Sequence, residues 1–264
     1  MRKLFLIGIG AGDPDHVTVQ AIKALNQVDV FFVMNKGTVT QDLTVLRQEI
    51  CERYIEHSAF RFVEAPDPVR DRAASSYRPA VEAWRQKRAA VYERLICEEL
   101  GEDDCGAFLV WGEPSFYDGT LRIVEEIVAR GHIQVDYEVI PGISSVQALA
   151  AKHRITLNRI GQTIQITTGR LLAENFSADS PDTVVVLDSE CSFQRVLADD
   201  VEIYWGAYLG TEDEILMSGN LANVADEIEA VRKRAKAQKG WIMDTYLLRR
   251  TPRCGPDRPP SDAV

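Results

Sequence analysis

The chain has 264 residues, of which 45% are hydrophobic and 27% charged, a composition typical of a globular protein with one large domain or two ordinary ones. Its net charge of −10 argues against sequence-independent binding of nucleic acid, which requires a cationic face. Five widely spaced cysteines without a CxxC pair argue against a disulfide framework and a thiolate zinc site, and they indicate a cytoplasmic protein. Because the N-terminal apolar run is short and no stretch approaches the roughly 18 to 20 apolar residues of a membrane span, we expect neither a signal peptide nor a membrane partner.

In the first half of the chain, buried-type apolar runs alternate with amphipathic helical patterns. The expected strands cover residues 3–9, 29–34, 107–111 and 137–140, and the expected helices cover residues 18–27, 80–100 and 121–129. Thr18 is placed to cap the first helix, and Gly131 is placed to end the third. Continuous apolar strands separated by helices predict a parallel sheet that is covered on both faces. Residues 53–79 show no clear pattern.

In the second half the alternation restarts after a polar, basic stretch. The expected strands cover residues 163–166, 183–187, 201–209 and 241–248, with a helix over residues 221–237. The last strands can pair antiparallel, which predicts a mixed sheet. We therefore expect an N-terminal α/β domain over residues 1–151, a linker over 152–161, a C-terminal α/β domain over 162–250 and a proline-rich, disordered tail over 251–264.

A glycine-rich loop, GIGAGDPDHVT, follows the first expected strand. Its glycines at positions 8, 10 and 12 form G-x-G-x-G, whereas the dinucleotide fingerprint requires G-x-G-x-x-G. The acids Asp13 and Asp15 also stand where the pyrophosphate would lie, which argues against a dinucleotide site. Because no GKS or GKT follows the glycines, the loop is not a P-loop. Taken alone, the loop is equally well explained as a tight turn without a ligand.

Two more loops of this kind follow the third and fourth expected strands. Residues 112–120 read GEPSFYDGT, and residues 141–145 read PGISS. The carboxyl ends of parallel strands meet at one edge of the sheet, which is where open α/β sheets bind ligands. Three loops at the same edge therefore predict a binding site.

These motifs and their order resemble the tetrapyrrole methyltransferases. The family's first signature is close to V-G-x-G-P-G-D-P-x-x-x-T, and residues 7–18 read IGIGAGDPDHVT. Its G-D-P-aromatic and P-G-[IV]-[ST]-[SA] signatures are matched by GEPSF at 112–116 and PGISS at 141–145. LGTEDE at 209–214 and SGNL at 218–221 resemble its late T-x-x-E…G-x-L pattern. Two positions depart from the pattern: Ala11 replaces a proline and Glu113 replaces an aspartate.

The resemblance implies two α/β domains with a cofactor cleft between them, S-adenosylmethionine as methyl donor, a tetrapyrrole substrate, no metal and a homodimer. Tyr117 and Asp118, together with the arginine-rich stretch over 71–94, resemble the branch that methylates C-1 of precorrin-5 and releases acetate in cobalamin biosynthesis. Relatives that methylate C-2 of precorrin-2 are the alternative within the family. An rRNA ribose methyltransferase of the same fold is a further alternative, which the acidic net charge disfavours.

The resemblance also implies which residues form the site. The cofactor contacts fall on Ala11, Trp111, Gly112, Glu113, Phe116, Ser144, Ser145, Leu187, Asp188, Gly206 and Ala207, and the substrate contacts fall on Gly10, Gly12, Asp13 and Tyr117. Asp13 and Asp118 are the catalytic candidates, since a carboxylate there could act as a general base. Each could equally stabilise a helix N-terminus, and Ser144 and Ser145 could equally cap a helix. The candidate partners for substrate carboxylates are Arg70, Arg72, Arg78, Arg85, Arg88 and Arg94, although a solvated basic helix face explains most of them.

Overall fold

The computed structural model of the chain describes residues 1–35, 41–69, 77–177, 179–196 and 198–251. The chain divides into two compact units, Met1–Ala148 and Leu149–Val264. The division lies three residues before the expected boundary at residue 151. Helix α5 (Ser145–His153) runs through it, so the polar stretch that we expected to be a linker begins inside a helix. Within the described ranges, no helix is both long and apolar enough to cross a membrane.

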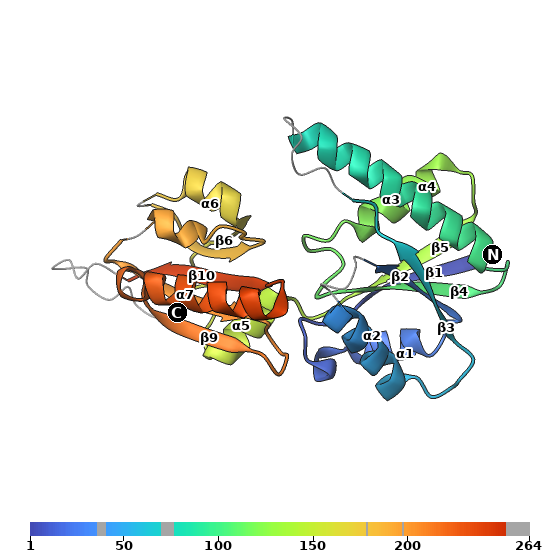
Figure 1. Cartoon of the computed structure of the whole chain (residues 1–264), viewed down its shortest axis with the longest axis horizontal. Coiled ribbons are helices and arrows are strands. Elements are labelled where there is room, and N and C mark those ends of the chain that lie inside the picture. The colour runs from blue at the N-terminus through green and yellow to red at the C-terminus, as the bar shows by residue number, and fades with distance from the viewer. Residues whose placement is uncertain (36–40, 70–76, 178, 197, 252–264) are drawn as a thin grey trace. The chain divides into compact units, whose positions relative to one another are not determined.

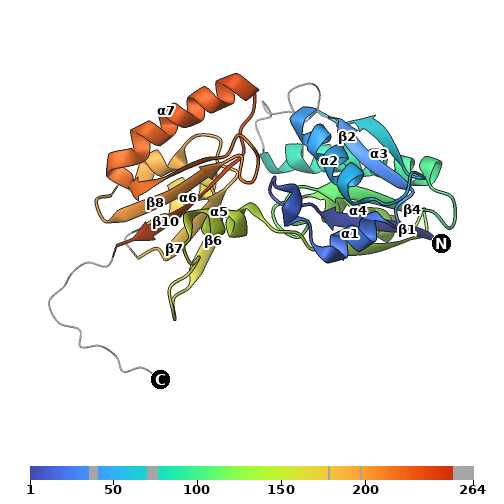
Figure 2. The same ribbon diagram turned by 90° about the horizontal axis from the view of Figure 1, so that it is seen from below.

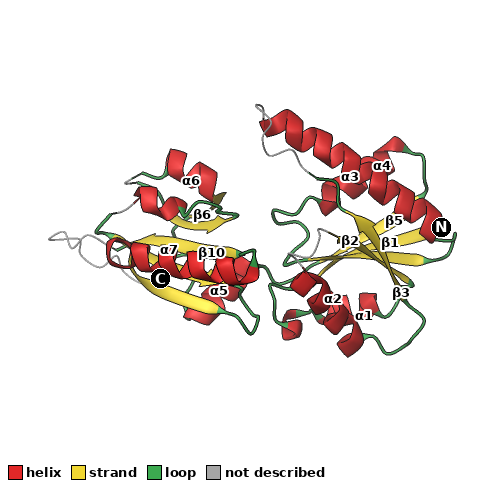
Figure 3. Cartoon of the chain, in the orientation of Figure 1, coloured by secondary structure: helices red, strands yellow, loops and turns green. Residues whose placement is uncertain are grey.

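Unit 1 is built around a five-stranded parallel sheet with the strand order β3-β2-β4-β1-β5. Its strands are β1 (Arg2–Gly8), β2 (Val30–Asn35), β3 (Arg61–Pro66), β4 (Cys105–Val110) and β5 (Val135–Ile140). Its helices are the short 3-10 helix η1 (Pro14–His16), α1 (Val19–Leu25), α2 (Gln41–Tyr54), α3 (Tyr77–Glu99) and α4 (Thr120–Arg130). The pairs α1–α2 and α3–α4 cover opposite faces of the sheet (Figures 1 and 3), which confirms the predicted architecture. Strand β3 and helix α2 were not expected.

The alternation of side chains along β1 explains why this strand is apolar throughout. Leu4 and Leu6 pack into the core under α3 and α4, whereas Phe5 and Ile7 pack into the core under α1 and α2. A central parallel strand is buried on both faces, so it has no polar side. In the register of the sheet, Ile7 lies between Leu109 of β4 and Ile140 of β5. The three glycine-bearing loops therefore start side by side, as the sequence predicts.

The expected helix ends are also present in unit 1. The Thr18 hydroxyl accepts a hydrogen bond from the Ala21 N–H at 3.1 Å, so Thr18 caps α1. Gly131 ends α4 with a φ of 68°, a left-handed conformation that costs glycine little.

Unit 2 contains a mixed five-stranded sheet with the order β6-β7-β10-β8-β9. Its strands are β6 (Ile164–Thr168), β7 (Asp182–Val186), β8 (Val201–Ala207), β9 (Ile215–Asn220) and β10 (Asp244–Arg250). Besides the end of α5, its helices are α6 (Gly169–Asn175), the 3-10 helix η3 (Ser192–Val196) and α7 (Leu221–Lys239), which lies along one face of the sheet (Figure 2). Strand β10 is antiparallel to both of its neighbours, which confirms the mixed sheet. Strand β9 and helix α6 were not expected, and residues 252–264 of the expected tail lie outside the described residues.

A buried polar cluster connects α7 to the sheet of unit 2. The Arg232 guanidinium donates from Nε to Asp244 Oδ2 at 2.8 Å, and from Nη2 to the Asp188 carbonyl at 2.6 Å. The Trp205 indole N–H donates to the same Asp244 oxygen at 3.0 Å. Because each charge has an opposite charge or a hydrogen-bond partner, the cluster can exist in the core.

Candidate functional site

The three glycine-bearing loops touch one another through their backbones. Gly10 and Gly112 form an isolated bridge, in which the Gly112 N–H donates to the Gly10 carbonyl at 2.7 Å. A Cβ at Gly142 would stand 2.1 Å from the Gly112 oxygen and 2.8 Å from Gly8 Cα. Only glycine allows this approach, because all of these neighbours are main-chain atoms. The glycines therefore bring the ends of β1, β4 and β5 together at the predicted site.

Glu113 fastens the second loop to the third. Its Oε2 accepts a hydrogen bond from the Gly142 N–H at 2.7 Å, and its Oε1 accepts from the Ser115 N–H and hydroxyl at 2.9 and 2.7 Å. Although partial burial alone would raise the pKa of Glu113, the bonds from Gly142 and Ser115 hold it below its ordinary value. The glutamate that replaces the family's aspartate thus has a structural role, since the Glu113 carboxylate contacts both loops.

Replacing Glu113 by glutamine should lower the free energy of unfolding by about 1–2 kcal/mol at pH 7, because the carboxylate receives charge-assisted hydrogen bonds. The pKa of Glu113 is lower in the folded state than in the unfolded state. The ionised carboxylate therefore stabilises the fold fully above the unfolded-state pKa, and this stabilisation is lost as the pH falls through the folded-state pKa. The difference between wild type and Glu113→Gln should therefore shrink below pH ~4. Urea unfolding at pH 7 and at pH 3.5 measures it, and Glu98→Gln in the exposed part of α3 is the control. A difference that stays constant with pH would contradict the assigned bonds.

Asp13 lies in the first loop and caps η1. Its Oδ1 accepts a hydrogen bond from the Asp15 N–H at 2.9 Å, while its Oδ2 lies 4.0 Å from His16 Nε2. The capping role that the sequence allowed is thus present. Its side chain is only partly buried, and its Oδ2 accepts no hydrogen bond among the described residues. Gly10 and Gly12, like Ala11 between them, are buried in the loop.

The second loop carries the aromatic pair and the other candidate carboxylate. The rings of Phe116 and Tyr117 meet edge to face at 4.9 Å, and Tyr117 is 48% exposed with a φ of 55°. A bulky residue in the left-handed region is strained, which is a feature of functional loops. Asp118 Oδ1 accepts from the Thr120 N–H at 2.7 Å, so its carboxylate also holds the start of α4.

The predicted cofactor residues of the third loop and of the adjoining part of the second loop have different surroundings. Ser144 caps α5 through its hydroxyl, which accepts from the Val146 N–H at 3.2 Å and donates to the Gln147 side chain. A Cβ at Gly112 would be in ordinary van der Waals contact with Ser144 Cα at 3.8 Å, and the backbone of Gly112 has a φ of 69°. Trp111 is partly buried against the core under α1 and α2.

In unit 2 the predicted cofactor residues differ in their surroundings. Leu187, just after β7, is 67% exposed with a φ of 53°, which again marks a strained and solvent-facing position. Asp188 is buried, and its carboxylate accepts from Ser192, Glu190 N–H and the Tyr246 hydroxyl. These contacts occupy the Asp188 carboxylate, and the Asp188 carbonyl accepts from the Arg232 guanidinium at 2.6 Å. Gly206 and Ala207 are buried in β8.

The arginines of α3 are mostly paired within unit 1. Arg88 is buried, forms an ion pair with Asp67 at 2.9 Å and donates to the Tyr92 hydroxyl at 2.8 Å, so it does not belong to a solvated face. Arg85 is paired with acidic side chains of α3 and α4, and Arg94 is exposed. Arg70 and Arg72, and the side chain of Arg78, lie outside the described residues.

Sequence reasoning missed Arg47 of α2. Its Nε donates to the Leu109 carbonyl at 3.2 Å, which places the guanidinium at the end of β4, where the second loop begins. Arg47 gives no signal in the sequence, because only the packing of α2 against the sheet brings it to this edge.

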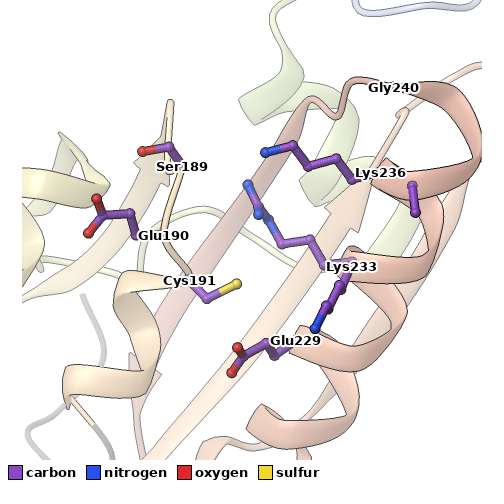
Figure 4. A pocket seen from close by; sticks show the side chains of 9 residues that line it. Ser189, Glu190, Cys191, Glu229, Lys233, Lys236 and Gly240 are labelled. Atoms are coloured by element: carbon purple, nitrogen blue, oxygen red, sulfur yellow. The ribbon is translucent and has the colours of Figure 1, made fainter. Parts of the chain in front are cut away.

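Unit 2 also has an open pocket of about 510 Å³ between the segment after β7 and helix α7 (Figure 4). It is lined by Ser189, Glu190, Cys191, Glu229, Arg232, Lys233, Lys236, Ala237 and Gly240. None of the residues predicted for the site lines it. Across the described ranges, no group of three or more histidine, cysteine, aspartate or glutamate side chains is arranged to hold a metal ion.

Comparison with known proteins identifies related chains. The model of the Tetrapyrrole (Corrin/Porphyrin) Methylases matches residues 3–225. A protein from Sinorhizobium sp named precorrin-6A synthase [deacetylating] is 52% identical over 250 residues, which cover 95% of this chain and 96% of that protein. The crystal structure of a cobalamin synthesis related protein (CobF) from Corynebacterium diphtheriae superposes on this chain with a TM-score of 0.80. The two sequences are 37% identical, and the match covers 95% of this chain and 99% of that one.

A relative from Methanocaldococcus jannaschii, named "Probable cobalt-precorrin-2 C(20)-methyltransferase", is 22% identical over 72% of this chain and 74% of its own length. Because the family model spans most of the chain and one relative is 52% identical over nearly its whole length, this chain belongs to the tetrapyrrole (corrin/porphyrin) methylases.

Proposed function

We propose that the protein is an S-adenosylmethionine-dependent C-methyltransferase that methylates C-1 of precorrin-5 and releases acetate to give precorrin-6A. The observation that carries the proposal is the 52% identity to the Sinorhizobium protein, which extends over 95% of the chain. The family model, which matches residues 3–225, includes all three glycine-bearing loops. The exposed Tyr117-Asp118 pair of the second loop supports the same branch.

The site residues have two proposed roles. For the methyl donor, the proposed contacts in unit 1 are Ala11, the second loop and the start of α5, and those in unit 2 are the segments at Leu187 and Gly206. The tetrapyrrole would lie against the first loop and Tyr117. S-adenosylmethionine, when bound, supplies a methyl group on a cationic sulfur. The chain's contribution is to align that methyl group with the ring carbon and to exclude water.

Asp13 is the residue that we propose to handle a proton in this site. Its Oδ2 has no hydrogen-bond donor among the described residues, and the ring nitrogen His16 Nε2 lies 4.0 Å from it. This oxygen can accept a proton from, or a hydrogen bond of, a pyrrole N–H. Release of acetate additionally requires that water add to the acetyl carbonyl and that the bond from that carbon to the ring break.

The experiment that tests the function is incubation of the purified protein with precorrin-5 and methyl-labelled S-adenosylmethionine. We expect label at C-1 of the product and one acetate released for each methyl transferred. Labelling of precorrin-2 in place of precorrin-5 would make the alternative corrinoid methyltransferase correct. Labelling of rRNA would assign the chain to a different substrate class.

Replacing Asp13 by asparagine should lower the rate of methyl transfer by about 10²–10⁴-fold, the usual contribution of a general base. The fold should be retained, because the asparagine oxygen can still accept from the Asp15 N–H. Asp15→Asn is the matched control, since Asp15 lies in the same loop but is exposed and paired with Arg53 at 2.6 Å. Single-turnover rates and thermal unfolding of both variants give the readout. Undiminished turnover of Asp13→Asn would remove Asp13 from the mechanism.

We also propose that the protein is a cytoplasmic homodimer. The dimer rests on the family resemblance. The compartment rests on the cysteines, since Cys51, Cys97, Cys105 and Cys191 are all free thiols. Light scattering coupled to size exclusion tests the dimer, and cell fractionation tests the compartment.

A further inference from the structure

Arg47 is held by two carbonyl groups at the edge of the sheet where the site lies. Nε donates to the Leu109 carbonyl at 3.2 Å and Nη1 donates to the Leu43 carbonyl at 3.0 Å. Leu109 is the next-to-last residue of β4, and the loop that carries Gly112 and Glu113 follows directly. The side chain of Arg47 therefore crosses from α2 to the end of a central strand, and its head is fixed there by neutral groups.

The Arg47 guanidinium has no direct counter-ion among the described residues, unlike several buried or half-buried arginines of unit 1. Arg61, Arg88 and Arg130 each contact a carboxylate, at 2.7, 2.9 and 3.0 Å respectively. Within the part of the chain that the structure describes, no carboxylate forms an ion pair with Arg47. Burial lowers the pKa of Arg47, and the more distant Tyr92 and Asp118 offset this only in part. A partly buried cation without a contact anion is unfavourable, so a ligand anion at this position would be stabilised.

The free donors of Arg47 suit a carboxylate. A guanidinium has five N–H groups, and the two carbonyls use two of them. The remaining three include both hydrogens of Nη2, which has no hydrogen-bond acceptor among the described residues. Donors on Nη1 and Nη2 can bind the two oxygens of one carboxylate in parallel, a geometry that lysine cannot reproduce.

We propose that Arg47 binds a peripheral carboxylate of the tetrapyrrole and so helps to set the orientation of the macrocycle over the three loops. The inference rests on the proposed function, because it takes the substrate to be a polycarboxylate ring. Asp118, whose Oδ1 accepts from the Thr120 N–H, forms no ion pair with Arg47 among the described residues.

The competing explanation is that Arg47 only ties α2 to the end of β4. In that case its removal would lower stability and would weaken binding of methyl donor and tetrapyrrole alike. A carboxylate-binding role predicts that only the binding of the tetrapyrrole is weakened. One charge-assisted, two-oxygen contact corresponds to a ~10–100-fold change in Kd.

The test compares wild type, Arg47→Gln, Arg47→Lys and the control Arg234→Gln, an exposed position on α7. Uroporphyrin I, an octacarboxylate ring, is titrated into each protein by absorbance and tryptophan fluorescence, and S-adenosylhomocysteine is titrated by calorimetry. We expect Arg47→Gln to weaken uroporphyrin binding by tenfold or more, Arg47→Lys to restore part of it, and Arg234→Gln to match wild type. Binding of S-adenosylhomocysteine should change by less than twofold in all four.

The inference would be overturned if Arg47→Gln bound uroporphyrin with an affinity within twofold of wild type. It would also be overturned if Arg47→Gln lost affinity equally for uroporphyrin and S-adenosylhomocysteine. If Arg47→Gln does not fold, the Arg47→Lys variant decides, because it keeps the charge but not the parallel donors. Failure of the proposed reaction is a separate result: the wild type would then not methylate precorrin-5, while the dependence of uroporphyrin binding on Arg47 could still be observed.

Discussion

Replacing Gly142 by alanine should lower the rate of methyl transfer by about 100-fold, because a displacement of about 1 Å at a reacting centre has an effect of this size. The added methyl group would stand 2.1 Å from the Gly112 oxygen and 2.8 Å from Gly8 Cα. Neither neighbour can rotate away, since both are backbone atoms at the ends of central strands. The third loop must therefore move from the other two, and the bond from the Gly142 N–H to Glu113 would stretch with it.

The same substitution should destabilise the protein by about 1–3 kcal/mol, the usual cost of overpacking a closely packed site. Gly119→Ala is the matched control. Gly119 precedes α4 on the same edge of the sheet, its φ is −96°, and a Cβ there would meet nothing within 4 Å. Single-turnover kinetics and urea unfolding of the two variants give the readout. Equal activity of Gly142→Ala and Gly119→Ala would contradict the close contact of the three loops.

Replacing Arg232 by methionine should lower the free energy of unfolding by about 3–5 kcal/mol, as is usual when one partner of a buried ion pair is removed. The substitution would leave the Asp244 carboxylate in the core with the Trp205 indole N–H as its remaining donor, and the Asp188 carbonyl would lose its partner at 2.6 Å. Because methionine fills a similar volume, the loss of unfolding free energy is caused by the missing charge and not by a cavity.

The control for this variant is Arg234→Met, two positions along α7 and exposed, which should change stability by less than about 0.5 kcal/mol. The double variant Arg232→Met, Asp244→Leu tests the cause directly, because removing both charges should recover much of the lost stability. Urea denaturation followed by circular dichroism measures all three. A loss below 1 kcal/mol for Arg232→Met would show that the cluster is solvated and not buried.

The fold was largely accessible from the sequence because its core obeys simple periodicities. The apolar runs of β1, β2 and β4 are continuous, as parallel strands covered on both faces require, and Thr18 and Gly131 marked helix ends by their own chemistry. Strand β3 and helix α2 could not be predicted in the same way. Strand β3 lies at the sheet edge with an exposed side, so its RFVEAP carries a weak pattern. Helix α2 is amphipathic only weakly, and its packing decides its place.

The sequence by itself determined the family motifs, the parallel sheet of unit 1 and the meeting of three glycine-bearing loops at one edge, because glycine spacing and strand polarity are local properties. Only the tertiary structure decided what individual side chains do there. It assigned Glu113 to fasten two loops, enclosed Asp188 and Arg88 in buried polar networks and brought Arg47 of α2 to the end of β4. The reason is physical: hydrogen-bond partners and counter-ions come from segments far apart in the chain, and no local pattern encodes which of them will meet.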